Sequence, residues 1–143
     1  NKTNTLASIN YLINAYGKID VDVDLVIPEE AVNIPRIGLQ FEMNRKLDHI
    51  SWYGRGPHEN YQDRKASAFV DLYTSKVSEQ YVPYIRPQDN GYKTDTRWVT
   101  FTNANGQGIK VKAPEYFSFS THHQYNDDFD AGKEKKYFVL EIL

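Results

Sequence analysis

One run of alternating residues constrains the fold more than any other feature of the chain. Apolar side chains occupy every second position from 19 to 27, namely Ile19, Val21, Val23, Leu25 and Ile27, and the positions between them include Asp20, Asp22 and Asp24. A period of two places the apolar side chains on one face of an extended strand and the acidic ones on the other. The run therefore predicts a half-buried β-strand.

The preceding segment predicts the partner of this strand. Residues 9–15 also alternate, and Gly17-Lys18 separates the two runs as a tight turn would. Further strands are expected at 37–43, 50–53, 95–102, 108–113 and 116–121. The turn at 103–106 contains an Asn-Gly pair, which tolerates positive φ. Only residues 127–136 favour a turn or two of helix.

Short strands separated by turn signals predict an all-β fold, an antiparallel sandwich with one solvated face on each outer strand. The chain has 143 residues, of which 40% are hydrophobic, so it can build one core. No linker or repeat divides it. We therefore expect a single domain over residues 1–143.

Charge and composition exclude several classes of partner. With 17 basic and 19 acidic side chains the net charge is −2, which provides no broad field for nucleic acid or an anionic membrane. No apolar run approaches the roughly 20 residues that span a bilayer, and Asn1–Thr5 lacks the features of a signal peptide. The absence of cysteine excludes disulfides and thiolate metal sites but leaves the compartment open.

A first long loop concentrates chemically active side chains. It runs through Gly54, Arg55, Gly56, Pro57, His58, Glu59, Asn60, Tyr61, Gln62, Asp63 and Arg64. His58 with Glu59 would suit acid-base chemistry, but neighbours in sequence often point apart. The favoured interpretation is a structural loop in which Asp63 or Glu59 pairs with an arginine.

A second long loop spans residues 83–94, and its tip consists of Arg86, Pro87, Gln88, Asp89, Asn90 and Gly91. Long irregular loops in compact domains are often functional, and Asn90-Gly91 is the expected pivot of this one. The alternative is a plain turn between strands. His122 and His123 are adjacent and point to opposite faces of a strand, so no metal site is expected. No pair of carboxylates stands out as catalytic.

Four motifs resemble one known family in their order and spacing. They are residues 34–39 (IPRIGL), 52–64 (WYGRGPHENYQDR), 84–91 (YIRPQDNG) and 96–98 (TRW). Together they resemble the small-chain, C-terminal domain of family 2 β-galactosidases. The resemblance implies a galactose-mutarotase-like supersandwich, longer than this chain at both ends, in a multidomain, bacterial-type enzyme of the cytoplasm or periplasm.

The resemblance also implies where the chemistry resides. The family's catalytic glutamates and magnesium ligands belong to a separate barrel, so this chain is expected to hold no cofactor and to be inactive alone. Its partners would be the remaining domains of the parent and, through them, a β-galactoside. The 86–91 loop matches a family loop at the mouth of the active site, although Gln88 and Asp89 replace the residues often found there.

Two other functions remain open from the sequence. A carbohydrate-binding module would need an exposed aromatic platform, which Trp52, Trp98 or several tyrosines could provide if they faced outward. A mutarotase-like epimerase would need a histidine and a glutamate that converge in a pocket, for which His58 and Glu59 are the only local candidates.

Overall fold

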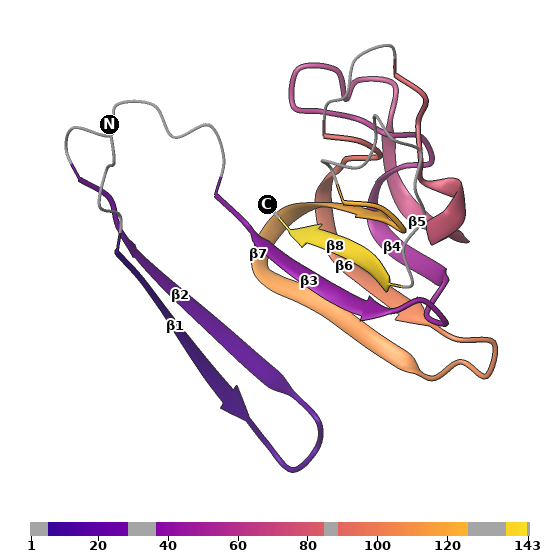
Figure 1. Ribbon diagram of the computed structural model, residues 1–143. Coiled ribbons are helices and arrows are strands. Elements are labelled where there is room, and N and C mark those ends of the chain that lie inside the picture. The colour runs from indigo at the N-terminus through magenta and orange to yellow at the C-terminus, as the bar shows by residue number, and fades with distance from the viewer. Residues whose placement is uncertain (1–5, 29–36, 85–88, 126–136, 143) are drawn as a thin grey trace. The chain divides into compact units, whose positions relative to one another are not determined.

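The computed structural model describes residues 6–28, 37–84, 89–125 and 137–142, and it is built from β-strands (Figure 1). Every pair of neighbouring strands is antiparallel. The chain divides into two compact units, residues 1–37 and 38–143. The predicted all-β antiparallel class is confirmed, and the sheets are consistent with a β-sandwich.

The first unit contains the predicted hairpin, formed by β1 (Leu6–Ile13) and β2 (Ile19–Val26). Ile9 pairs with Val23 and Tyr11 with Val21, so the apolar positions of both strands share one face. Gly17 in the connecting turn has φ +78°, a conformation that glycine adopts without steric cost. The period-two pattern thus predicted both the strands and their pairing.

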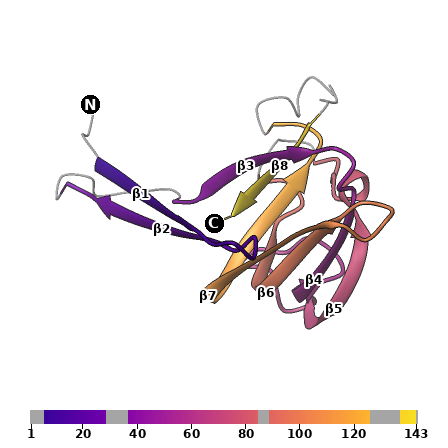
Figure 2. The same cartoon turned by 90° about the horizontal axis from the view of Figure 1, so that it is seen from below.

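The second unit is a six-stranded sheet with the order β3-β8-β7-β6-β4-β5. Its strands are β3 (Leu39–Asn44), β4 (His49–Gly56), β5 (Phe69–Lys76), β6 (Lys93–Thr102), β7 (Gly108–His122) and β8 (Tyr137–Ile142). A single 3₁₀ turn, η1 (Val77–Glu79), follows β5. The sheet is strongly curved, as Figures 1 and 2 show.

Three details differ from the sequence prediction. The strands β5 and β8 were not predicted, and residues 54–56 belong to β4 rather than to the first loop. The segments 108–113 and 116–121 form the single strand β7, because Pro114 falls where the β6–β7 register shifts and no ladder hydrogen bond is required of it. The predicted helical turn at 127–136 lies outside the described residues.

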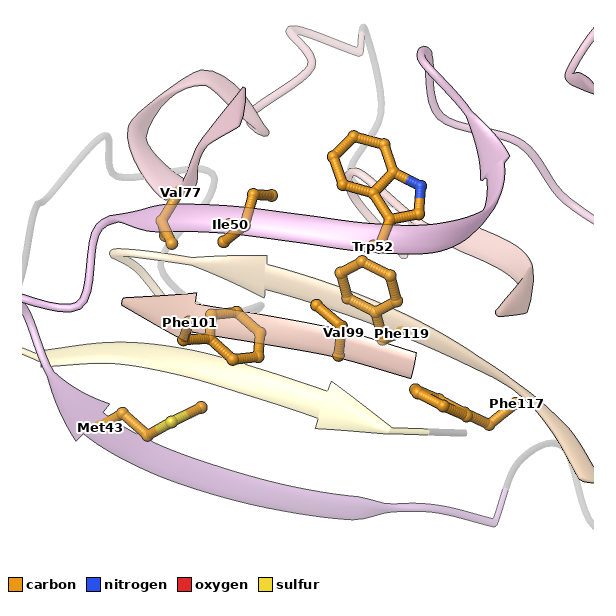
Figure 3. Packing of buried hydrophobic residues seen from close by; sticks show 8 residues of the cluster. All are labelled: Met43, Ile50, Trp52, Val77, Val99, Phe101, Phe117 and Phe119. Carbon is orange, nitrogen blue, oxygen red and sulfur yellow. The ribbon is translucent and has the colours of Figure 1, made fainter. Parts of the chain in front are cut away.

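Inward-facing side chains from four strands and η1 form the core, which Figure 3 shows from close by. Its members are Met43, Ile50, Trp52, Val77, Val99, Phe101, Phe117 and Phe119. Trp52 is 1% exposed and meets Phe119 edge to face, with 6.3 Å between the ring centroids. This core anchors β4 and β6, the two strands from which the long loops extend.

Candidate functional site

The two loops singled out from the sequence lie against each other at one end of the sheet. Asn60 N donates a hydrogen bond to Tyr92 O at 2.8 Å. Asn60 Oδ1 accepts from Thr94 N at 3.1 Å and from Thr94 Oγ1 at 2.6 Å. Asn60 and Thr94 are both fully buried, so these bonds are shielded from water and join the loops firmly.

Aromatic and charged side chains cover this junction. Tyr61 of the first loop stacks on Tyr92 of the second, with ring centroids 5.1 Å apart and planes tilted by 15°. The Arg64 guanidinium lies 4.3 Å from the centre of the Tyr61 ring and donates to Tyr84 Oη at 3.1 Å. The stacking and the hydrogen bond therefore connect the two loops, and the cation–π contact holds Arg64 against Tyr61 within the first loop.

Glu59 is the acid of the first loop that pairs with an arginine. Arg64 Nη1 donates to Glu59 Oε1 at 2.6 Å. Burial raises the pKa of Glu59, but hydrogen bonds from Arg64 and Tyr84 outweigh that effect and leave the pKa below its ordinary value. Asp63, the other candidate, is exposed, and no ion pair is recorded for it within the described chain.

A second ion pair, which the sequence did not indicate, holds the base of the first loop. Arg55 Nε donates to Asp95 Oδ2 at 2.5 Å, and Arg55 Nη1 donates to the carbonyls of Lys65 and Ala68 at 3.3 and 2.7 Å. Lys65 Nζ adds a contact to Asp95 at 3.3 Å. Burial raises the pKa of Asp95, yet the bonds from Arg55 and Lys65 hold it below its ordinary value.

No spacing rule joins Arg55 to a residue 40 positions away, which is why the pair could not be predicted. One backbone feature marks Asp95 in the structure. It is the only non-glycine residue with positive φ, at +50°, among the described residues. This conformation lies at the β6–β7 register shift that follows Lys93, where the strand leaves the regular ladder.

The remaining residues of the first loop have structural surroundings. A Cβ on Gly54 would lie 2.8 Å from Thr96 Oγ1, and one on Gly56 would lie 2.8 Å from the Tyr73 ring, so both positions require the smallest residue. His58 Nε2 lies 3.1 Å from Ser67 Oγ, and Pro57 follows a cis peptide bond. Gln62 accepts from Lys65 Nζ at 2.7 Å.

The second loop is closed at its base by the side chain of Asn90. Val82 N donates to Asn90 Oδ1 at 2.7 Å, and Asn90 Nδ2 donates to Val82 O at 2.6 Å. This pair of bonds imitates a backbone bridge, and Asn90 is only 2% exposed. Asp89 is half-buried, whereas Arg86, Pro87 and Gln88 lie outside the described residues.

Gly91 lies in this base, and the pivot that the sequence suggested there stays a prediction. It is buried with φ +63°, and a Cβ there would lie 2.5 Å from Gln80 O and 2.8 Å from the His122 ring. His122 Nε2 lies 2.6 Å from Asn90 O and therefore carries the hydrogen of that bond. Burial lowers the pKa of His122 to about 4, so this ring is neutral at physiological pH.

Beneath the junction lies a buried lysine. Lys93 is 2% exposed, and its Nζ lies 5.2 Å from the centre of the Trp52 ring. Burial lowers the pKa of Lys93 to about 8, a shift that the negative charge of Glu59 partly offsets. The burial of Lys93 was not predicted, because a lysine at the start of a strand is normally solvated.

His58 and Glu59 do not form an acid-base pair. The Glu59 carboxylate is held by Arg64, while the His58 ring contacts Ser67, so each has its own partner. An open surface depression of about 540 Å³ lies elsewhere, around His49, Ser51, Thr74, Lys76 and Thr102, and neither His58 nor Glu59 lines it. The convergence that an epimerase requires is therefore not found between His58 and Glu59.

Neither tryptophan offers a fully exposed ring for a carbohydrate platform. Trp52 is buried in the core, so it offers no surface. Trp98 is half-buried, and Lys110 Nζ lies 4.3 Å from the centre of its ring.

Within the described ranges, no group of three or more histidine and acidic side chains is arranged to hold a metal ion.

Comparisons with known proteins agree on one family. The model of the family described as beta galactosidase small chain matches residues 2–139. A beta-galactosidase from Priestia megaterium is 46% identical over 111 residues, which is 76% of this chain and 11% of that protein. A beta-galactosidase from Vibrio cholerae is 40% identical over 114 residues, 80% of this chain and 11% of that protein.

The chain thus spans about a tenth of the length of the curated relatives it matches. A beta-galactosidase from Pseudoalteromonas haloplanktis is 38% identical over 109 residues, which is 76% of this chain and 10% of that protein. In the described part of the chain, no helix has the length and apolar character to cross a membrane.

We predict that Asp95→Asn destabilises the chain by about 1 to 3 kcal/mol, because it leaves the Arg55 charge without its carboxylate. Asparagine tolerates the positive φ of this position, so the backbone is preserved. Urea unfolding at neutral pH measures the loss, and Asp63→Asn is the matched control that should leave stability unchanged.

The same pair predicts a pH dependence. A lowered pKa stabilises the fold above the unfolded-state pKa of about 3.9, and this contribution is lost as the pH falls through the folded-state pKa. The difference between wild type and Asp95→Asn should therefore shrink in acid. Equal unfolding midpoints for the two proteins at neutral pH would show that the ion pair contributes nothing.

We also predict that Lys93→Met changes how stability responds to alkali. Between about pH 8 and pH 10.4 the unfolded lysine is protonated and the folded one is not, so wild-type stability rises with pH across this window. The variant should lack this rise, of about 1 to 3 kcal/mol. Unfolding curves across the window test it, with the exposed Lys112→Met as control. Parallel profiles for wild type and Lys93→Met would contradict it.

Proposed function

The chain belongs to the β-galactosidase small-chain family, and we propose that it is a non-catalytic β-sandwich domain of a β-galactosidase that completes and partly lids the active site. The observation that carries the proposal is the family match over residues 2–139, together with relatives of which this chain spans only about a tenth. The parent enzyme would hydrolyse terminal β-D-galactosides with retention of configuration.

The chemistry of the two loops supports a non-catalytic role. Retaining glycosidases use two carboxyl groups about 5 to 5.5 Å apart, one a proton donor and the other a nucleophile. The carboxylates at the junction are committed to cations, Glu59 to Arg64 and Asp95 to Arg55 and Lys65. Their lowered pKa values make them poor proton donors. We therefore propose that the reacting carboxyls, and any magnesium, are bound by other domains of the parent.

The construction of the second loop supports the lid. The two hydrogen bonds between Asn90 and Val82, here called the Asn90 clamp, join the two ends of the loop. Gly91 and His122 pack beneath them. These contacts hold the residues at the two ends of the loop, so closure over a substrate would not require the sheet to change. A loop that closes over a substrate excludes water and completes the binding site.

The first test is activity of the purified chain. We expect no turnover of a chromogenic β-galactoside, because the acid and the nucleophile lie outside this chain. The full-length parent, assayed in parallel, should hydrolyse the substrate. Turnover by the chain, purified from a host without its own β-galactosidase, would refute the non-catalytic assignment. An inactive parent would refute the assignment of the parent.

The second test concerns the lid, in the full-length parent. Gln88→Ala and Asp89→Ala should alter kcat and KM together and lower kcat/KM by up to about 100-fold, because the tip no longer positions the substrate. The unfolding midpoints of both variants are measured alongside, because Asp89 is half-buried and a loss of stability must be separated from a change in kinetics. Glu115→Ala, an exposed acid on β7, is the control for the lost charge. Wild-type kinetics in both tip variants would mean that the loop is a passive connector.

A further inference from the structure

The chain contains two Asn-Gly pairs, and the structure places them in opposite surroundings. We propose that Asn105 is a site of spontaneous deamidation, which converts it to aspartate and isoaspartate, and that the fold protects Asn90 from the same reaction. Both pairs have the same local sequence chemistry. Any difference between them must therefore come from the structure around them.

The reaction needs no enzyme and no oxidant. The backbone nitrogen of the glycine attacks Cγ of the asparagine, a new N–Cγ bond forms, the Cγ–Nδ2 bond breaks, and ammonia leaves with the proton of the former N–H. Water then opens the succinimide ring. Cleavage of the new N–Cγ bond gives aspartate, and cleavage of the original peptide C–N bond gives isoaspartate. Glycine favours the attack because it has no Cβ to obstruct it and its backbone is the most adaptable.

Asn105 lies in the exposed turn that joins β6 to β7. Its side chain is exposed and makes no recorded hydrogen bond within the described chain. The turn is held by local bonds, from Gly106 N to Asn103 O at 3.0 Å and from Asn105 N to Asn103 Oδ1 at 2.9 Å. Gly106 has φ +76°, with no atom within 4 Å of the position of a Cβ.

Only the bond from Gly106 N must open for the attack. A solvent-exposed turn opens locally at low cost, since its backbone groups exchange one partner for water. The surrounding open space also lets the Asn105 side chain rotate, ammonia leave and water enter. Every step of the reaction is therefore accessible without unfolding of the sheet.

Asn90 is fixed in each of these respects. Both atoms of its amide group are bonded to Val82, at 2.7 and 2.6 Å, and the residue is 2% exposed. Gly91 is packed against Gln80 O and the His122 ring, so its nitrogen cannot swing toward the side chain without displacing them. Attack at Asn90 would require opening of the whole loop base.

Deamidation at Asn105 would change the turn in two ways. Both products add a negative charge at neutral pH, and isoaspartate also inserts the side-chain carbon into the backbone. The longer backbone would no longer match the bonds that Asn103 Oδ1 accepts from Asn105 N and from Gln107 N at 2.9 and 3.1 Å. The β6–β7 turn would lose its local hydrogen bonds, while the core would stay intact.

Ageing of the folded chain in mildly alkaline buffer, followed by tryptic peptide mapping, tests the proposal. The peptide of residues 98–110 carries Asn105, and that of residues 77–93 carries Asn90, because Pro87 blocks cleavage after Arg86. At Asn105 we expect the mass change of an amide converted to an acid, with isoaspartate among the products. At Asn90 we expect the same modification to be slower than at Asn105 by roughly tenfold or more. Asn103 in the first peptide is distinguished by fragmentation.

Two controls make the outcome decisive. In urea both asparagines should react at similar rates, since the fold no longer protects Asn90. Gly106→Ala should slow the reaction at Asn105 in the folded chain. The added methyl group meets no neighbouring atom but is strained at φ +76°, so the unfolding midpoint of this variant is measured alongside to show that the fold is retained. The proposal is overturned if Asn90 reacts as fast as Asn105 in the folded chain, or if Asn105 is unchanged there while both react in urea.

Discussion

The ion pair between Arg55 and Asp95 is the contact on which the loop end of the sheet depends. One guanidinium reaches the start of β6 through Asp95, and through the carbonyls of Lys65 and Ala68 it reaches the segment that follows the first loop. Without it, a positive charge at 25% exposure would have no counter-charge at the end of β4. The bonds of Asn60 to Tyr92 and Thr94 continue the same connection toward the second loop. The two loops are therefore one structural element, although they are far apart in sequence.

The strands that could be predicted are those with one apolar and one polar face. The hairpin alternates cleanly, and its predicted pairing is confirmed. The strand β5 was not predicted because both of its faces carry apolar residues. Val70 and Leu72 lie on one face, and Phe69 and Tyr73 on the other, so no period of two stands out. β8 has the nearly continuous apolar run YFVLEI, which periodicity cannot distinguish from other buried segments. The pairing partner, and not the strand's own pattern, identifies both.

The site shows the same limit. Residue types and loop length were sufficient to single out both loops, and Glu59 does pair with an arginine, as one interpretation required. The sequence could not show that the loops touch, because that follows from the β4–β6 pairing and from bonds such as those of Asn60. Nor could it show which glycines are closely packed. Gly91 and Gly106 share positive φ, but an added Cβ would clash at Gly91 and meet open space at Gly106.

Buried polar groups hold the base of the second loop against the sheet. Asn90, His122 and Lys93 are each at most 3% exposed, and moving any of them would exchange specific contacts for unsatisfied polar atoms. Asn90 is bonded to Val82, the neutral His122 ring donates to Asn90 O, and the Lys93 ammonium lies over Trp52 in the core. The base is thus connected to Trp52, the largest of the fully buried side chains. The base of the second loop is therefore part of the packing of the sheet.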